Sequence, residues 1–161
     1  DMSVTSVCSG LYYLSKTQHM IGGWIASVGG KAVIADENLG YEYPLDVPFN
    51  CVVIGNDFIC NRKTVSSQIL GVAISQNLRI IDVKQGYTKC SLCPVRENAV
   101  ITDDSGIEKA LLKYGYDVLK VNKGSVRLHG FDYGFIGGCS AMISRDILLF
   151  FGTIFSCAEF K

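Results

Sequence analysis

A glycine followed by an aromatic residue recurs along the chain and constrains its fold more than any other sequence feature. The pairs are Gly40-Tyr41, Gly86-Tyr87 and Gly130-Phe131, at intervals of 46 and 44 residues. Each pair precedes a small or polar loop and then short apolar runs. A regular interval of this length indicates a supersecondary unit that occurs several times, each copy burying its apolar face on the next.

Each interval predicts a hairpin, then a helix, then a further strand. Apolar, β-forming runs predict strands at residues 49–54, 58–60, 78–83, 99–102, 116–121, 141–143 and 147–151. Helices are predicted over 65–76 and 105–114, where apolar residues recur at helical spacing. Asp103 or Asp104 can cap the second helix at its start, and Gly115 suits its end.

The same pattern predicts an α/β fold class, with strand–strand–helix–strand units of about 45 residues forming one domain, residues 1–161. Its divisions are an incomplete unit, two complete units and an opening hairpin, at 1–39, 40–84, 85–128 and 129–155. A weak helix over 17–28 and a strand over 31–35 make up the incomplete unit. Because the array starts and stops within a unit, we expect either a piece of a longer protein or a homo-oligomer whose open ends meet.

Composition and charge exclude several classes of protein. The 15 Lys and Arg balance the 15 Asp and Glu, and the absence of a basic run argues against nucleic-acid binding. No apolar run reaches the roughly 18 residues that cross a membrane. Seven cysteines in a chain that is 48% hydrophobic indicate reduced thiols and a cytoplasmic location. No dinucleotide or phosphate loop motif occurs, so no cofactor is expected.

Three longer motifs carry a resemblance to a known family. They are Tyr43-Pro-Leu-Asp-Val-Pro-Phe-Asn50, Gln85-Gly-Tyr-Thr-Lys-Cys-Ser-Leu-Cys93 and Phe131-Asp-Tyr-Gly-Phe-Ile-Gly-Gly138. With the order of the units, they resemble the pentein fold of the guanidino-group-modifying enzymes, and within it an uncharacterised bacterial branch. The resemblance covers about residues 40–152 and implies part of an α/β propeller built from five such units.

The resemblance implies a hydrolase or transferase that acts on a small guanidino compound related to arginine. Characterised members use a nucleophilic Cys in the last unit, a His acid and base, and carboxylates that hold the guanidinium. The last units are absent from this chain, and the fold also hosts a non-catalytic ribosome-binding factor. A binding module of the same fold is therefore the alternative to an enzyme.

His129, Asp132 and Cys139 are the candidate catalytic residues. A Cys attacks a guanidinium carbon as the thiolate, a His moves the proton, and a carboxylate pairs with the planar cation. All three residues lie in a glycine-rich stretch, where the backbone can approach a ligand closely. The alternative interpretation is a tight turn with a buried Cys139 and a solvated His129.

Asp46 and Asp132 are the candidate substrate-binding residues. Asp46 either faces a channel, where it holds a cation, or organises the turn before Pro48. Cys90 and Cys93 form a C-x-x-C pair that we place on a loop before a strand. Such a pair is typical of half a zinc site or of a redox disulfide, and it can also be a buried structural pair. A metal or thiol protein centred on these cysteines is a third functional hypothesis.

Overall fold

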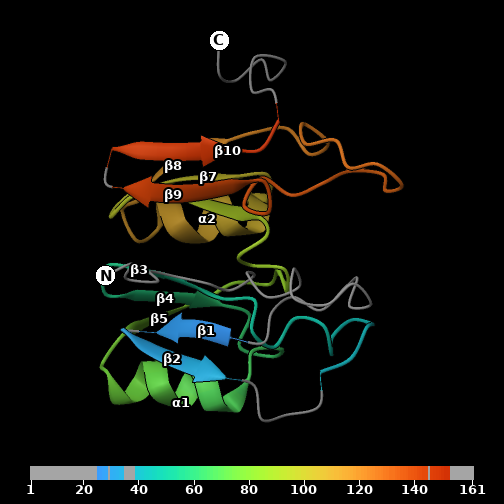
Figure 1. Ribbon diagram of the computed structural model, residues 1–161. Coiled ribbons are helices and arrows are strands. Elements are labelled where there is room, and N and C mark those ends of the chain that lie inside the picture. Colours follow the sequence, from blue (N-terminus) through green and yellow to red (C-terminus); the bar gives the residue numbers. More distant parts are fainter. Residues whose placement is uncertain (1–24, 29, 35–38, 145, 153–161) are drawn as a thin grey trace. The chain divides into compact units, whose positions relative to one another are not determined.

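The computed structural model describes residues 25–28, 30–34, 39–144 and 146–152 (Figure 1). These residues form a mixed α/β structure of short strands and two helices. The chain divides into two compact units, residues 1–89 and 90–161. Within the described residues, neither helix has the length and apolar content that a membrane crossing requires.

The first unit combines two hairpins with a helix and a parallel strand. Its elements are β1 (Ile25–Val28), β2 (Lys31–Ile34), β3 (Val52–Ile54), β4 (Asp57–Cys60), α1 (Ser67–Ser75) and β5 (Arg79–Asp82). β1 pairs antiparallel with β2, and β3 pairs antiparallel with β4. β5 then lies parallel to β4. The strands therefore form a two-stranded sheet and a separate three-stranded sheet in the order β3-β4-β5.

The second unit uses the same order and ends on a further hairpin. Its elements are β6 (Leu92–Arg96), β7 (Ala99–Thr102), α2 (Ser105–Leu112), β8 (Asp117–Lys120), β9 (Ser140–Ser144) and β10 (Ile147–Phe150). β6 is antiparallel to β7, and β8 is parallel to β7. β9 and β10 form an antiparallel pair of their own. Hairpin, helix and parallel strand thus follow one another in each unit.

The core of the first unit lies between α1 and the strands. Phe58 and Cys60, two positions apart on β4, point to the same face of the sheet and are fully buried. Ile69 and Ala73, four positions apart on α1, meet that face. The β1–β2 hairpin adds Val33 to the same cluster. Since α1 contacts both β1 and β5, the helix holds the hairpin and the sheet together (Figure 1).

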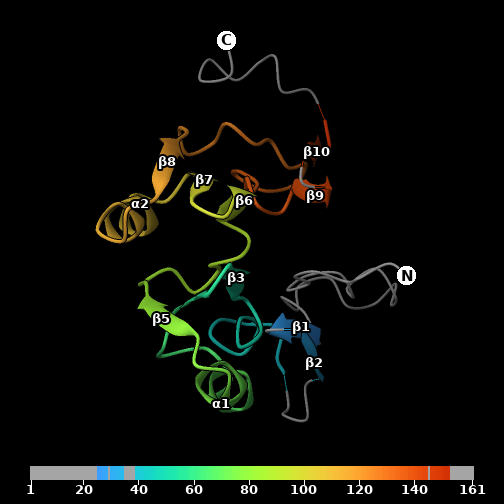
Figure 2. The ribbon, with the colours of Figure 1, turned by 90° about the vertical axis from the view of Figure 1, so that its left-hand side faces the viewer.

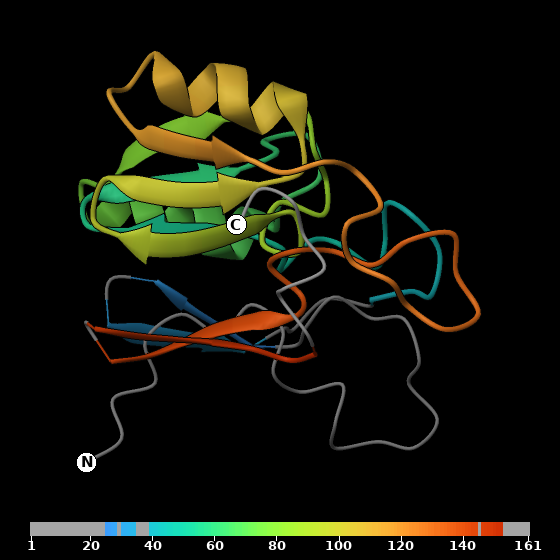
Figure 3. The same cartoon turned by 90° about the horizontal axis from the view of Figure 1, so that it is seen from above.

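The second unit buries both faces of its three-stranded sheet. Cys93 and Ile101 are register partners, and they share a cluster with Phe150 of the β9–β10 hairpin. Val100 points the other way, toward α2, whose Leu111 is fully buried. α2 and the hairpin accordingly lie on opposite sides of β6–β8 (Figure 2 and Figure 3).

The ends of α2 follow the sequence signals. Asp104 is the N-cap, and its carboxylate accepts hydrogen bonds of 2.8 Å from the amides of Gly106 and Ile107. Gly115 adopts φ +81, a left-handed conformation that glycine takes without strain. The amide after Gly115 then donates to the Leu111 carbonyl at 3.2 Å, which closes the last turn. The predicted cap and stop are therefore confirmed.

The helix predicted over 17–28 is wrong for its last four residues. Residues 25–28 form β1, which pairs with β2 across a two-residue turn that includes Gly30 at φ +79. Gly30, just beyond the predicted helix, allows the tight turn, and the flanking residues Ile25, Val28 and Val33 favour strand pairing. Residues 17–24 of that prediction lie outside the described residues.

An ion pair fixes the start of β5. Asp57 and Arg79 are register partners on β4 and β5. Arg79 donates through Nε to Oδ1 of Asp57 at 2.6 Å and through Nη2 to Oδ2 at 2.7 Å. The Asp57 side chain is only 7% exposed, whereas that of Arg79 is 54% exposed. This two-pronged geometry is the strongest form of an arginine–carboxylate contact.

Replacing Arg79 with alanine should lower the free energy of unfolding by about 1–3 kcal/mol, because the buried carboxylate of Asp57 loses a charged partner. Urea denaturation measures the loss. Lys63→Ala, which removes an exposed cation from the same unit, should change the free energy by less than about 0.5 kcal/mol. Equal effects of the two substitutions would contradict a stabilising role for the pair.

Candidate functional site

Two loops of the first unit meet at one end of its sheet. The loop over residues 39–51 leads into β3, which is antiparallel to β4, so it ends beside the carboxyl end of β4. The loop that begins at residue 83 follows the carboxyl end of β5 directly. In open α/β sheets, ligands bind at the carboxyl ends of parallel strands, because loops from neighbouring strands converge there.

Asp46 and Tyr87 join these two loops. The Tyr87 hydroxyl donates a hydrogen bond to Oδ2 of Asp46. Asp46 is only 3% exposed, and its other oxygen, Oδ1, is buried with no hydrogen-bond partner among the described residues. A buried carboxylate oxygen that lacks a donor destabilises a folded protein. Such an oxygen is therefore a candidate acceptor for a ligand.

The turn around Asp46 is held by its backbone. The Leu45 amide donates to the Glu42 carbonyl at 2.8 Å, and the Asn50 amide donates to the Val47 carbonyl at 2.9 Å. The carboxylate of Asp46 reaches across to Tyr87. Its side chain is thus available for a role other than closing the turn.

A second hydrogen bond joins the same two loops as the Tyr87–Asp46 contact. The Lys89 amide donates to Oδ1 of Asn50 at 2.6 Å. Both residues are buried, with exposed fractions of 2% for Asn50 and 8% for Lys89. Thr88 is fully buried, and its hydroxyl bonds to the Gln85 carbonyl at 2.6 Å. Polar contacts therefore order the loop that carries Tyr87.

Gly86 allows an aromatic ring to lie against the backbone. A Cβ atom at Gly86 would stand 2.5 Å from Cε2 of Tyr43, closer than real Cβ contacts allow. The Tyr43 and Tyr87 rings form a tilted pair with centroids 6.1 Å apart. Gly40 is restricted in a similar way, since a Cβ there would lie 2.8 Å from Cβ of Leu45. Close approach therefore accounts for the glycine in two of the three glycine–aromatic pairs.

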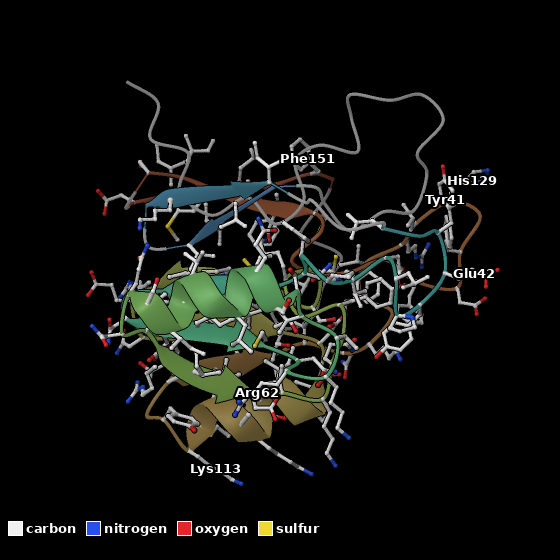
Figure 4. The ribbon with its side chains drawn as sticks, turned by 90° about the horizontal axis from the view of Figure 1, so that it is seen from below. Tyr41, Glu42, Arg62, Lys113, His129 and Phe151 are labelled. Atoms are coloured by element: carbon white, nitrogen blue, oxygen red, sulfur yellow. The ribbon has the colours of Figure 1, made fainter. Side chains whose placement is uncertain are left out.

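The three candidate catalytic residues lie in the second unit. His129 and Asp132 are exposed, and their side chains form no hydrogen bond or ion pair with the described residues. His129 stands on the outside of its loop (Figure 4). Cys139 is half-buried and packs against the cluster that contains Ile136, and its thiol lies 3.4 Å from the Ile136 carbonyl oxygen. The structure does not join His129 or Asp132 to Cys139.

The C-x-x-C pair is divided between a loop and a strand. Cys93 lies within β6 and is fully buried, so the prediction that the pair stands on a loop before a strand is wrong for Cys93. β6 is an edge strand, which tolerates Pro94. Cys90 is half-buried, and its carbonyl accepts the amides of Gly137 and Gly138 at 2.7 and 3.2 Å. Among the described residues, no three His, Cys, Asp or Glu side chains converge as metal ligands would.

Cys60 is an unreactive thiol by its surroundings. Its side chain is fully buried. Burial and, to a lesser extent, the negative charge of Asp82 raise the pKa of the Cys60 thiol to about 12, and the positive charge of Arg62 opposes this shift more weakly. Only the thiolate is a nucleophile and a metal ligand. Near neutral pH the buried Cys60 therefore stays protonated and belongs to the core.

Alkylation tests this assignment. At pH 8 in the native protein, iodoacetamide should leave Cys60 unmodified, because the thiolate fraction is roughly a thousandfold below that of an ordinary cysteine. In urea the same residue should react, as peptide mass spectrometry can measure. The raised pKa also means that stability is lost as pH rises from 9 toward 12, where the thiol ionises first in the unfolded chain. Rapid native alkylation of Cys60 would refute the assignment.

Sequence reasoning named Asp46 but missed Tyr87, Asn50 and Lys89 as residues of the same site. The signal was present, because two of the three motifs that carry the family resemblance contain these residues. Their partnership was hidden because Asp46 and Tyr87 are separated by 41 positions. Only the pairing of β5 with β4 brings the two loops together.

The whole chain, residues 1–161, matches one protein family, described as a family of unknown function (DUF6873), and the chain belongs to it. No curated protein matches the chain. No solved structure matches it either.

Proposed function

We propose that this protein is a pentein-type binding module that holds a small guanidino compound at Asp46. The observation that carries the proposal is the buried Oδ1 of Asp46, which accepts no hydrogen bond among the described residues. The strand–strand–helix–strand order of both units supports a pentein-like arrangement, part of an α/β propeller.

A guanidinium ion suits this carboxylate. It is planar, always protonated near neutral pH, and carries five N–H donors in a fixed fork. Because Tyr87 occupies Oδ2 of Asp46, an incoming N–H group would bond to Oδ1. A charged hydrogen bond in buried surroundings is stronger than a neutral one. The ligand would supply the donor that Oδ1 lacks.

Binding without catalysis is favoured by the second unit. Cys139 packs against apolar side chains, and its thiol faces a backbone carbonyl. His129 and Asp132 stand exposed on the surface. A nucleophilic cysteine needs a neighbouring base to form its thiolate. These contacts support a structural role for Cys139 and a binding role for the protein.

Asp46→Asn tests the proposal on the full chain. This substitution keeps the side chain's shape but removes its charge, so agmatine should bind about 10- to 100-fold more weakly, as measured by titration calorimetry. Asp117→Asn removes the same charge from an exposed position on β8 and should leave the affinity unchanged. Thermal denaturation establishes that both variants fold. Equal affinities of wild type and Asp46→Asn would contradict the proposal.

Turnover separates the binding module from the enzyme. Incubation with agmatine, arginine or methylated arginines should release no ammonia and form no ureido product. Ammonia release by the wild type, abolished in a folded Cys139→Ala variant, would assign a hydrolase and overturn the binding role.

A further inference from the structure

We infer that Tyr43 is a specificity-determining residue of this site, whose ring stacks on a planar cation held by Asp46, so that the site prefers a guanidinium to an ammonium ion. The inference rests on the proposed function. It gives a role in binding to Tyr43, which so far is only the first residue of a motif, and it states which cations the site accepts.

Tyr43 and Asp46 stand on the same backbone turn, which the 2.8 Å hydrogen bond from Leu45 to Glu42 closes. Tyr87 touches both of them. Its ring pairs with that of Tyr43 at 6.1 Å between centroids, and its hydroxyl bonds to Asp46. A continuous chain of contacts thus runs from the Tyr43 ring to the buried carboxylate.

Tyr43 is also the accessible end of this chain. It is 54% exposed, while Asp46 is 3% exposed. Gly86 supports one edge of the ring, because the absence of a Cβ leaves room for it. Tyr41 and Glu42 lie at the outer end of the same loop (Figure 4). Among Tyr43, Tyr87 and Asp46, Tyr43 is therefore the residue that a cation in solvent reaches first.

The two kinds of cation use such a site differently. A guanidinium donates in its plane and stacks through its face, and it is weakly hydrated. An ammonium is compact and strongly hydrated, and it has no flat face to lay on a ring. Tyr87 already occupies one oxygen of the Asp46 carboxylate, so a bound guanidinium cannot donate to both oxygens. Stacking on the Tyr43 ring would supply the binding energy that the second hydrogen bond cannot.

The experiment compares butylguanidinium with butylammonium on the full chain by titration calorimetry. The wild type should bind butylguanidinium about 3- to 30-fold more tightly. Tyr43→Leu should bring the ratio of the two affinities close to one, whereas Tyr43→Phe, which keeps the ring, should preserve it. Gly86→Ala should act like Tyr43→Leu, because the added Cβ displaces the ring without removing it.

The outcomes distinguish this inference from the function on which it rests. If Asp46→Asn weakens both cations while Tyr43→Leu leaves their ratio unchanged, the binding site stands and the role of Tyr43 is overturned. If the wild type binds neither cation, both proposals are overturned. Thermal denaturation of each variant establishes folding, and Tyr43→Phe controls for loss of packing at the loop.

Discussion

Parallel pairing of the strand that follows each helix is the constraint on which the described structure depends. In the first unit, the Arg79 amide donates to the Asn56 carbonyl at 2.8 Å, and Val83 closes the other end of the pairing on Cys60. In the second unit, Asp117 bonds to Asn98 in the same way. A parallel strand must return to the starting end of the sheet, and the helix provides that crossover. In the first unit, the loop that follows β5 consequently starts at the carboxyl end of β4, where the loop before β3 also ends.

Burial determines how the Asp46 carboxylate in these loops can form hydrogen bonds. A carboxylate at the protein surface would satisfy both oxygens with water, but Asp46 is enclosed and its partner Tyr87 satisfies only one. The same enclosure elsewhere has the opposite effect, because burial keeps the Cys60 thiol protonated and inert. The thiols that the structure buries pack with apolar residues, whereas the Asp46 carboxylate accepts a hydrogen bond from Tyr87 of another loop.

The sequence predicted what depends on neighbouring residues and failed where distant residues decide. The helix start at Asp104 follows from bonds to the next few amides, so it was predictable. The site was only half predictable: Asp46 stood out as an acidic residue at the start of a unit, but its partner Tyr87 depends on strand pairing elsewhere. Cys93 was placed on a loop, but it lies in β6, an edge strand that accepts the proline that follows it. Asn77 takes the left-handed conformation after α1 that Gly115 takes after α2, a choice no spacing reveals.

The contact between Gly86 and Tyr43 has a consequence for how the chain can change. A Cβ atom at position 86 would lie 2.5 Å from Cε2 of Tyr43, so the ring fills the space that any side chain there would need. A larger residue at position 86 is therefore compatible with this loop only if position 43 becomes smaller or its ring swings away. The two positions lie far apart in sequence, yet they are free to vary only as a pair.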